Sequence, residues 1–475
     1  MNSTLSVSEY FSYFKDKRLI NVFIFGMSSG FPWVLIGSVM SAWLKDEGLS
    51  RSMIGLFGIV FGAYSINFLW SPLIDRTKLP FLYHWLGQRR SWILFCQSFI
   101  LLGTLLLAGL DLKANLAVAA ALCLLIAIAS ATQDIAIDAF RIDTLSENES
   151  HKATAAAAMA TSGWWTGYAL LGAVPFYMAD MPNIDWPQVY YFLSAIMLLL
   201  ISCVFWAKEP QSNREAVHAE LERVYLEKLA ATKQTPLTKT LAWLGVTVVD
   251  PFKTFFAKNG VKTALALLAF IFLFKIGEAF LARMSIVFYK EVGFSNTQIA
   301  NYSKLGTGLI TIVFAFLGSI FNHKYGIVKG LFISGVAMAA SNLMFSWIAL
   351  AGPQEHLYAM AIVVDGFTQA WSLVAMVAFI SMLCDRAFSA THYALLASLG
   401  NLGRTLLSSY SGVVIDDWLM GRQRRLAGIW QHFGFAHEQP GVGGLPEVVH
   451  HKPAAHTARG LQLGPAGASG GSLSR

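Results

Sequence analysis

The chain has 475 residues, of which 55% are hydrophobic and only 13% charged, and its mean hydropathy is +0.52. These values exclude an ordinary soluble domain and indicate a polytopic membrane protein. The net charge of +7 could suggest a nucleic-acid partner. However, the basic residues concentrate in every second polar connection, as the positive-inside rule requires of cytoplasmic loops. We therefore expect a lipid bilayer and no nucleic acid as the partner, with a cytoplasmic N-terminus.

Apolar stretches long enough to cross about 30 Å of hydrocarbon as helices recur along the chain. We predict eleven such spans and an all-α fold. The spans run over residues 19–43, 53–74, 92–110, 115–138, 154–178, 187–206, 262–289, 298–321, 328–350, 357–383 and 391–414.

A weak internal repeat divides these spans into two halves. Lys45–Ile54 resembles Lys290–Ile299, which lies 245 residues later, and each copy joins the first and second spans of its half. Parallel repeats of six spans are typical of the major facilitator fold, in which substrate binds near the midplane between the halves. The predicted domains are an N-terminal half over 1–206, a cytoplasmic linker with an interfacial helix over 207–260, a C-terminal half of five spans over 261–418, and a tail over 419–475.

The connection after the second span carries charges of both signs. Asp75-Arg76 and, further on, Arg89-Arg90 resemble the acidic and basic loop motif of major facilitator proteins, although with a longer spacer. We predict a gating or structural role for these four residues. The linker segment from Asn213 to Lys233 is rich in Glu, Lys, Ala and Leu and is predicted to be a solvated helix rather than a site.

The fourth span ends in an unusual set of charged side chains. Asp134, Asp138 and Arg141 are spaced four and three residues apart and therefore lie along one helical face. A charge inside a bilayer helix costs about 2.5–3.5 kcal/mol on insertion scales, so it is usually functional. One interpretation makes Asp134 a proton carrier and Asp138 a further candidate for coupling, with Asp138 and Arg141 forming a pair that holds the cytoplasmic end closed. The alternative is a structural set of salt bridges at the membrane boundary.

The seventh span contains a second intramembrane pair, Lys275 and Glu278, three residues apart. These two side chains could simply neutralise each other. Alternatively, Lys275 could bind an anionic substrate while Glu278 couples transport to protons. In the internal repeat, Lys275 is equivalent to Gly30 and Glu278 to Trp33 of the first span. The first span of each half is therefore irregular or charged at the same depth.

Other polar or aromatic side chains could face a cavity. We predict substrate contacts for Gln133, Tyr64, Asn67 and Trp164, although an aromatic side chain at a span end commonly serves as an interface anchor. Asp365 and Arg404, in spans ten and eleven, could form a buried structural pair.

Four segments of the chain, in order and over about 400 residues, are similar to segments of the AmpG muropeptide permease family. They are Phe68–Arg76, Ser130–Asp143, Phe274–Phe280 and Phe388–Leu396. The resemblance implies a proton-driven importer in the bacterial inner membrane, which carries N-acetylglucosaminyl-anhydro-N-acetylmuramyl peptides to the cytoplasm. There they enter peptidoglycan recycling and the signal that induces β-lactamase. The family often has Asp where this chain has Glu278, and Gln where it has His392.

Enzyme motifs are absent from the sequence: it has no Walker A loop, no His-Glu-x-x-His helix and no Cys-x-x-Cys pair. We therefore expect a non-enzymatic monomer that needs no cofactor or metal and draws energy from a proton gradient. Alternatives are a related transporter of another sugar or acyl-CoA conjugate, and an inactive membrane protein that binds without transporting.

The tail after residue 419 is rich in Gly, Pro, His and Arg, so we expect it to be disordered in place of a twelfth span.

Overall fold

The computed structural model describes residues 7–211, 213–228, 236–294 and 306–409, all within one compact unit. Side chains at 7–8, 51–52, 55, 147, 228, 236–237, 275–287, 290–291 and 403–409 are outside this description. Every regular element in the described ranges is helical, as predicted. The tail from residue 419, and with it the predicted loss of a twelfth span, lies outside these ranges.

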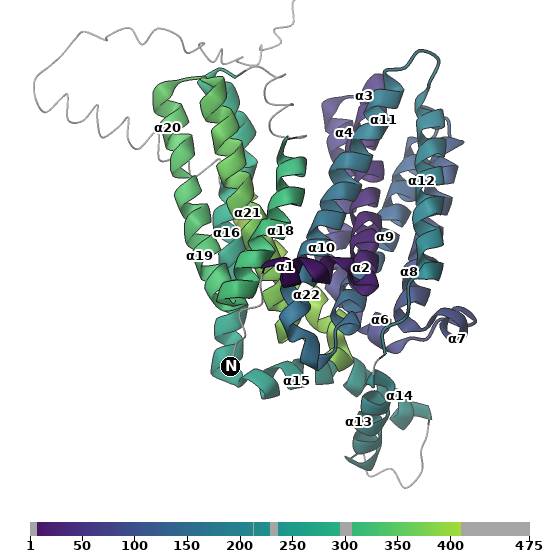
Figure 1. The fold of residues 1–475 in the computed structure, drawn as a ribbon. Coiled ribbons are helices and arrows are strands. Elements are labelled where there is room, and N and C mark those ends of the chain that lie inside the picture. Colours follow the sequence, from purple (N-terminus) through teal and green to yellow (C-terminus); the bar gives the residue numbers. More distant parts are fainter. Residues whose placement is uncertain (1–6, 212, 229–235, 295–305, 410–475) are drawn as a thin grey trace, which may run out of the picture. The chain divides into compact units, whose positions relative to one another are not determined.

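Helices from the N-terminus to residue 206 form the first set, shown from purple to teal-blue in Figure 1. They are α1 (Val7–Ser12), η1 (Tyr13–Lys15), α2 (Lys17–Trp33), η2 (Val34–Val39), α3 (Met40–Asp46), α4 (Arg51–Phe57), η3 (Gly58–Phe61), α5 (Gly62–Ile66), η4 (Asn67–Leu69), α6 (Ser71–Arg76), α7 (Leu82–Leu86), α8 (Gln88–Ala108), α9 (Leu116–Thr144), η5 (Glu147–Lys152), α10 (Ala153–Trp165), η6 (Thr166–Leu170), α11 (Leu171–Ala179) and α12 (Trp186–Trp206).

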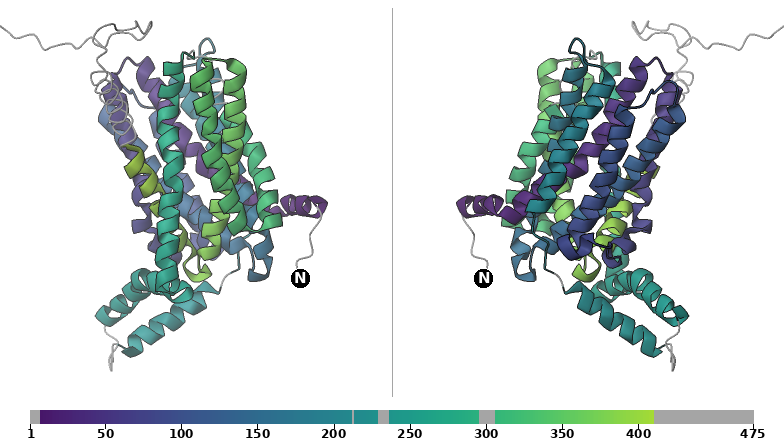
Figure 2. Two further views of the ribbon diagram at one scale, coloured as in Figure 1. Left: turned by 90° about the vertical axis from the view of Figure 1, so that its left-hand side faces the viewer. Right: turned by 90° about the vertical axis from the view of Figure 1, so that its right-hand side faces the viewer.

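A connecting group and a second set of helices follow. The connecting helices are α13 (Arg214–Lys228), α14 (Pro236–Leu244), η7 (Gly245–Val249) and α15 (Asp250–Asn259). The second set is α16 (Val261–Val292), α18 (Thr307–Tyr325), α19 (Ile327–Ser341), α20 (Leu343–Ala351), α21 (Glu355–Leu383), η9 (Arg386–Phe388) and α22 (Ser389–Ser409). Figures 1 and 2 show α13, α14 and α15 together at one end of the long helices, which we call the linker end.

The described residues do not test the predicted number of eleven spans, because the predicted spans over 298–321 and 391–414 extend outside them. Within the described ranges, seven helices are long and apolar enough to cross a membrane, and an eighth is obtained if the pair Thr238–Asn259 and Val261–Phe274, bent by 105°, counts as one. The predicted span over 53–74 is a run of short helices from α4 to α6. The chain breaks there because Ile66 and Trp70 have φ near −110° and ψ near 0°, outside helical values.

Close contact between α2 and α10 depends on glycines. A Cβ atom added at Gly30 would lie 2.1 Å from the carbonyl oxygen of Trp164, and one added at Gly163 would lie 2.1 Å from that of Phe23. Gly26 and Gly167 extend the same interface, so each helix carries two small residues four positions apart. This spacing brings two membrane helices into backbone contact. It thereby sets the position of Ser28 and Ser29, which lie between Gly26 and Gly30 on α2.

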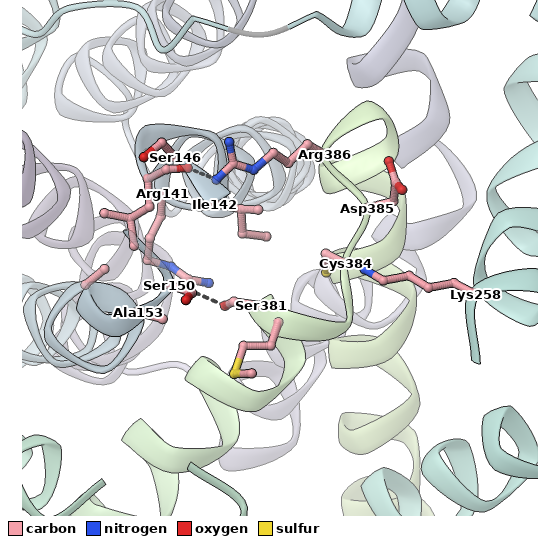
Figure 3. A pocket seen from close by; sticks show the side chains of 13 residues that line it. Arg141, Ile142, Ser146, Ser150, Ala153, Lys258, Ser381, Cys384, Asp385 and Arg386 are labelled. Carbon is pink, nitrogen blue, oxygen red and sulfur yellow. Dashed lines mark hydrogen bonds between the residues drawn. The ribbon is translucent and has the colours of Figure 1, made fainter. Parts of the chain in front are cut away.

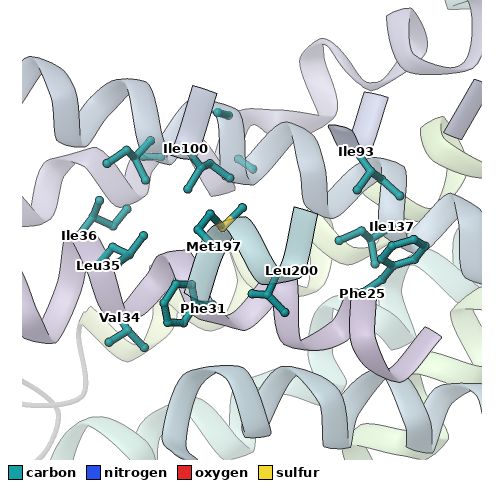
Figure 4. Close-up of a cluster of buried hydrophobic side chains, with 14 of the residues drawn as sticks. Phe25, Phe31, Val34, Leu35, Ile36, Ile93, Ile100, Ile137, Met197 and Leu200 are labelled. Carbon is teal, nitrogen blue, oxygen red and sulfur yellow. The ribbon is translucent and has the colours of Figure 1, made fainter. Parts of the chain in front are cut away.

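The largest apolar cluster lies within the first set of helices. Phe25, Phe31 and Leu35 from the first long helix meet Ile100 of α8 and Met197 of α12, and all are buried (Figure 4). Side chains packed at this density hold α2, α8, α9 and α12 at fixed positions. The polar residues of α9 therefore project from a rigid support.

Candidate functional site

The charged face of α9 contacts helices from both sets. The Ser29 hydroxyl donates a hydrogen bond of 2.6 Å to the Asp134 carboxylate, and Asp134 forms no ion pair with any described residue. One turn further, Arg141 binds Asp138 at 3.1 Å and donates a hydrogen bond of 2.6 Å to Ser381 of α21. The predicted common face is thus divided: Asp138 and Arg141 form an ion pair, whereas the partner of Asp134 among the described residues is a neutral hydroxyl.

Aromatic side chains surround the approach to this region. The Trp33 ring lies 4.4 Å from that of Tyr64 and 4.8 Å from that of Phe61, measured between centroids. Trp164 lies 6.1 Å from Trp33 and stacks on Tyr168 at 5.0 Å. Trp33 and Trp164 are both partly exposed, so their rings offer apolar faces to a ligand. Two of the predicted substrate residues, Tyr64 and Trp164, therefore belong to one aromatic cluster, which also includes Trp33.

Several buried polar atoms lie beside Asp134. They are Trp33 Nε1, Tyr64 Oη, Ser130 Oγ and Gln133 Oε1. The Tyr64 and Ser130 hydroxyls lie within hydrogen-bonding reach of each other. Trp33 Nε1 and Gln133 Oε1 have no partner among the described residues. Leaving a buried donor or acceptor unpaired costs about 1–3 kcal/mol, so a polar ligand group would be favoured there. We call Ser29, Trp33, Tyr64, Ser130, Gln133 and Asp134 the α9 polar site.

Gln133 is fixed by the helix that faces it. The side chain is completely buried, and Nε2 donates a hydrogen bond of 2.7 Å to the carbonyl oxygen of Ser28. Oε1 of its amide has no partner among the described residues and could accept a hydrogen bond from a ligand. Helical phase predicts that Gln133 points away from the Asp134 face, but it does not predict this bond to α2. A role in binding substrate remains a prediction.

Asn67 connects the two sets of helices. Its amide nitrogen donates to the Ala131 carbonyl oxygen at 3.4 Å, and its amide oxygen accepts from Ser398 of α22 at 3.2 Å. Lys275 and Glu278 are on α16 and Arg404 is on α22, but their side chains lie outside the described part of the structure. The roles predicted for these three residues, and the pairing of Arg404 with Asp365, therefore stay predictions. Asp365 accepts hydrogen bonds from Ser341 at 3.0 Å and Gln369 at 2.6 Å.

The linker end is closed by a buried polar network. Arg89 on α8 is fully buried and binds Asp75 at 2.7 Å and Asp143 at 2.9 Å. Ser389 donates to Asp143 at 2.8 Å, and both the backbone amide and the hydroxyl of Thr391 donate to Asp75, at 2.9 and 2.7 Å. We call these five residues the linker-end network. Because Ser389 and Thr391 begin α22, the network joins α6, α8 and α9 of the first set to the second set.

Arg76 and Arg90, the other two arginines of the predicted loop motif, bind outside the linker-end network. Arg90 donates to the Val204 carbonyl oxygen at 2.9 Å and so caps the end of α12, while Arg76 forms an ion pair with Glu222 of α13. Sequence reasoning singled out Asp75 and Arg89 but gave no role to Ser389 or Thr391. The only local signal is that Ser and Thr commonly begin a helix.

The prediction that the α13 segment is a solvated helix, with no part in a site, is wrong for its inner face. Arg214 is buried and binds Asp143 at 3.2 Å, and the buried His218 ring donates a hydrogen bond of 2.9 Å to the Ala387 carbonyl oxygen. Tertiary packing overrides composition here, because the buried Asp143 carboxylate and Ala387 carbonyl need donors. The linker therefore takes part in closing the linker end.

Comparison with known proteins agrees with this architecture. A family model described as the Major Facilitator Superfamily matches residues 22–418. The transporter AmpG 4 of Rickettsia felis is 32% identical over 403 residues, which cover 85% of this chain and 91% of the relative. The anhydromuropeptide permease of Escherichia coli K12 is 31% identical over 412 residues, covering 86% and 76%. The chain belongs to the AmpG family of the major facilitator superfamily.

Solved structures show the same fold for this AmpG-family chain. The proton:xylose symporter XylE bound to 6-bromo-6-deoxy-D-glucose matches with a TM-score of 0.55 at 17% identity, covering 88% of the chain and 91% of XylE. The transporter FucP in its outward conformation matches with a TM-score of 0.56 at 12% identity, covering 84% and 91%. Family and fold are thus those of multi-pass membrane transporters rather than enzymes.

His218 gives the AmpG-family chain a specific pH dependence. Burial, assisted by the charge of Arg76, lowers the His218 pKa from 6.5 to about 4. The unfolded chain therefore binds more protons than the folded one between these values, so His218 stabilises the fold above pH 6.5 and this contribution is lost as the pH falls towards 4. We expect a loss of at most about 3 kcal/mol. The measurement is the thermal unfolding midpoint in detergent from pH 7 to pH 4.

A His218→Asn variant is the control, since its amide keeps a donor for Ala387 but does not titrate in this range. Carboxylates elsewhere also titrate near pH 4 and affect both proteins alike. The decline between pH 6.5 and 4 should therefore be shallower in the variant. Parallel curves for the two proteins would contradict the assignment to His218.

Proposed function

We propose that this protein is a proton-coupled importer of N-acetylglucosaminyl-anhydro-N-acetylmuramyl peptides in the bacterial inner membrane. The observation that carries the proposal is the α9 polar site, in which Asp134 has a hydroxyl partner and lies among unpaired polar atoms and aromatic faces. Sugar rings stack well on aromatic side chains, and the polar atoms suit hydroxyl and amide groups. The name of the Escherichia coli relative supports this substrate class.

Proton coupling is assigned to Asp134. A half-buried carboxyl in an apolar helix bundle, with no cation partner among the described residues, can gain and lose a proton as its surroundings change. Asp138 already pairs with Arg141 at 3.1 Å, so it is better suited to stabilise one conformation than to carry the proton. Lys275 is proposed as a counter-charge for substrate carboxylates and Glu278 as a second coupling carboxyl. Gln133, Tyr64, Asn67 and Trp164 are proposed to contact substrate.

The proposed direction of transport follows from the distribution of charge. The linker end holds Arg76, Arg89, Arg90 and Arg214, so by the positive-inside rule we assign it to the cytoplasm. The described conformation is then the one closed to the cytoplasm. Residues 1–206 and 261–418 would act as halves of a monomer that move about the central site, with 207–260 as the linker. Imported muropeptide would supply peptidoglycan recycling and the β-lactamase induction signal.

We expect Asp134→Asn to abolish accumulation of labelled anhydro-muropeptide in proteoliposomes with an imposed pH gradient. The amide can still accept the hydrogen bond from Ser29, but it cannot carry a proton, so net uptake should fall by at least about tenfold. Purified variant and wild type are compared with the gradient present and collapsed.

Asp180→Asn is the matched control, since it makes the same change at an exposed carboxylate near the end of α11. Wild-type uptake by Asp134→Asn would refute the proton assignment. Gradient-independent binding without accumulation, in the wild type itself, would favour an inactive binding protein. Uptake of a different sugar or acyl-CoA conjugate alone would favour the related-transporter alternative.

A further inference from the structure

A cavity lies at the linker end, away from the α9 polar site. It has a volume of about 360 Å³, and its walls come from both sets of helices and from the linker helix α15 (Figure 3). Arg141 of α9 and Ser150 of η5 belong to the first set. Ser381, Asp385 and Arg386 belong to α21, η9 and the turn between them, and Lys258 extends from α15.

Positive charge is in excess around this cavity. Arg141, Lys258 and Arg386 face one acidic side chain, Asp385. The Asp385 carboxylate is already engaged, since it accepts a hydrogen bond of 2.9 Å from the backbone amide of Ala387. Asp138 offsets part of the Arg141 charge, at 3.1 Å. Even so, the lining residues carry three positive charges and one negative charge.

Donor capacity remains in the cavity. Arg141 is 2% exposed; its nitrogens bind Asp138 and Ser381, and its guanidinium lies 4.9 Å from the Tyr393 ring. Its Nε atom is buried with no acceptor among the described residues. Arg386 uses one nitrogen on the Leu145 carbonyl oxygen. Lys258 has neither a hydrogen bond nor an ion pair to any described residue. A buried guanidinium donor without an acceptor is costly, and an anionic oxygen would satisfy it with a charge-assisted bond.

An adjoining cavity provides a route for an anion. It has a volume of about 980 Å³, and Ser146, Asp385 and Arg386 line both cavities. Its wall adds four cations, Lys17, Arg18, Lys208 and Arg214, and two carboxylates, Asp143 and Glu209, so cations are in excess there as well. Cations lining a cleft with low-dielectric walls concentrate anions there and speed their binding.

We propose that the smaller cavity binds a small anion with carboxylate or phosphate groups, held by Arg141, Lys258 and Arg386. Because these residues come from α9, α15 and η9, the bound anion links the first set of helices to the linker and the second set. It therefore stabilises the conformation closed at the linker end. The site is independent of the proposed transport function, because it requires neither proton coupling nor a particular transported substrate.

The test measures thermal unfolding of the full-length protein in detergent, in sodium phosphate against sodium chloride of equal ionic strength. Mass action predicts that saturating phosphate raises the midpoint by about 2 °C or more. Lys258→Gln should remove most of this rise. Lys258 is exposed on α15 and makes no contact that the fold needs, so the variant should fold. Lys262→Gln, which removes an equally exposed charge four residues along, should keep the full rise.

One further arm identifies the source of the anion, and the Lys258 and Lys262 variants guard against a general salt effect. An anhydro-muramyl tripeptide replaces phosphate in that arm. A Lys258-dependent rise with phosphate assigns a free anion, and one with the tripeptide alone assigns a substrate carboxylate; either supports the site. The proposal is overturned if neither compound raises the midpoint, or if all three proteins respond equally. Because the assay involves no transport, its result is separate from the outcome of the Asp134 experiment.

Discussion

Arg89→Gln should destabilise the protein and reduce transport to background. The substitution leaves the Asp75 and Asp143 carboxylates buried without the guanidinium that binds both, at 2.7 and 2.9 Å. Removing one partner from a buried ion pair costs about 3–5 kcal/mol, because the remaining charge is uncompensated. Arg214 still binds Asp143 at 3.2 Å, so the lower end of this range is expected, mainly from Asp75. Since every 1.4 kcal/mol changes an equilibrium tenfold, even about 3 kcal/mol shifts the balance between the closed conformation and its alternatives more than a hundredfold.

The measurements are the unfolding midpoint in detergent and uptake in proteoliposomes. Arg223→Gln is the matched control, since Arg223 pairs with Glu220 at 2.7 Å but both side chains are more than half exposed. Exposed pairs contribute little, about 0–1 kcal/mol. Arg89→Lys should fall between wild type and Arg89→Gln, because an ammonium keeps the charge but cannot bind both acids with one planar group. A wild-type midpoint and wild-type uptake in Arg89→Gln would show that the network does not hold the linker end closed.

The second large effect is expected at the contact between α2 and α10. Gly30→Ala places a Cβ atom 2.1 Å from the carbonyl oxygen of Trp164, far inside van der Waals contact. A backbone atom cannot move aside as a flexible side chain can, so the two helices must separate. Overpacking of a close-packed interior typically costs about 1–3 kcal/mol and sometimes more. We expect the upper end of that range or beyond, with low yield of folded protein and loss of uptake, since Ser29 and Trp33 shift with α2.

Gly62→Ala provides the comparison, because nothing lies within 4 Å of a Cβ atom built at Gly62. Alanine is the better helix former by about 1 kcal/mol, so this variant should be as stable as wild type or slightly more stable. Midpoints and folded yields of the two variants are measured in parallel. Equal midpoints would mean that α2 and α10 are not in the close contact described.

Parts of the candidate site could be predicted because they depend on one helix only. Asp138 and Arg141 are three residues apart on α9 and form the expected pair at 3.1 Å. Asp75 and Arg89 could be singled out as charged residues near span ends. Their full set of partners could not, because Ser389 and Thr391 lie about 300 residues further along the chain. Nothing in the local sequence of α8 specifies which distant helix its arginine meets.

Other features were missed although a signal was present. Gly26 and Gly30 on α2, with Gly163 on α10 and Gly167 on the η6 segment that continues it, show the small-residue spacing of close membrane helices. The composition of α13 indicated a solvated helix, yet Arg214 and His218 are buried. A charged helix can bury one face when buried acceptors lie opposite it. Its own sequence does not show whether they do.

The sequence by itself determined that this is a helical membrane protein of the AmpG family, with carboxylates in an apolar helix. Hydropathy, helix length and the spacing of charges on one helix are local properties, and local properties can be read along the chain. Only the tertiary structure decided that Asp134 binds Ser29, that Gln133 is bound to Ser28, and that the linker helps to close one end. Helical periodicity defines the faces of each helix, but which faces meet depends on packing across the whole bundle.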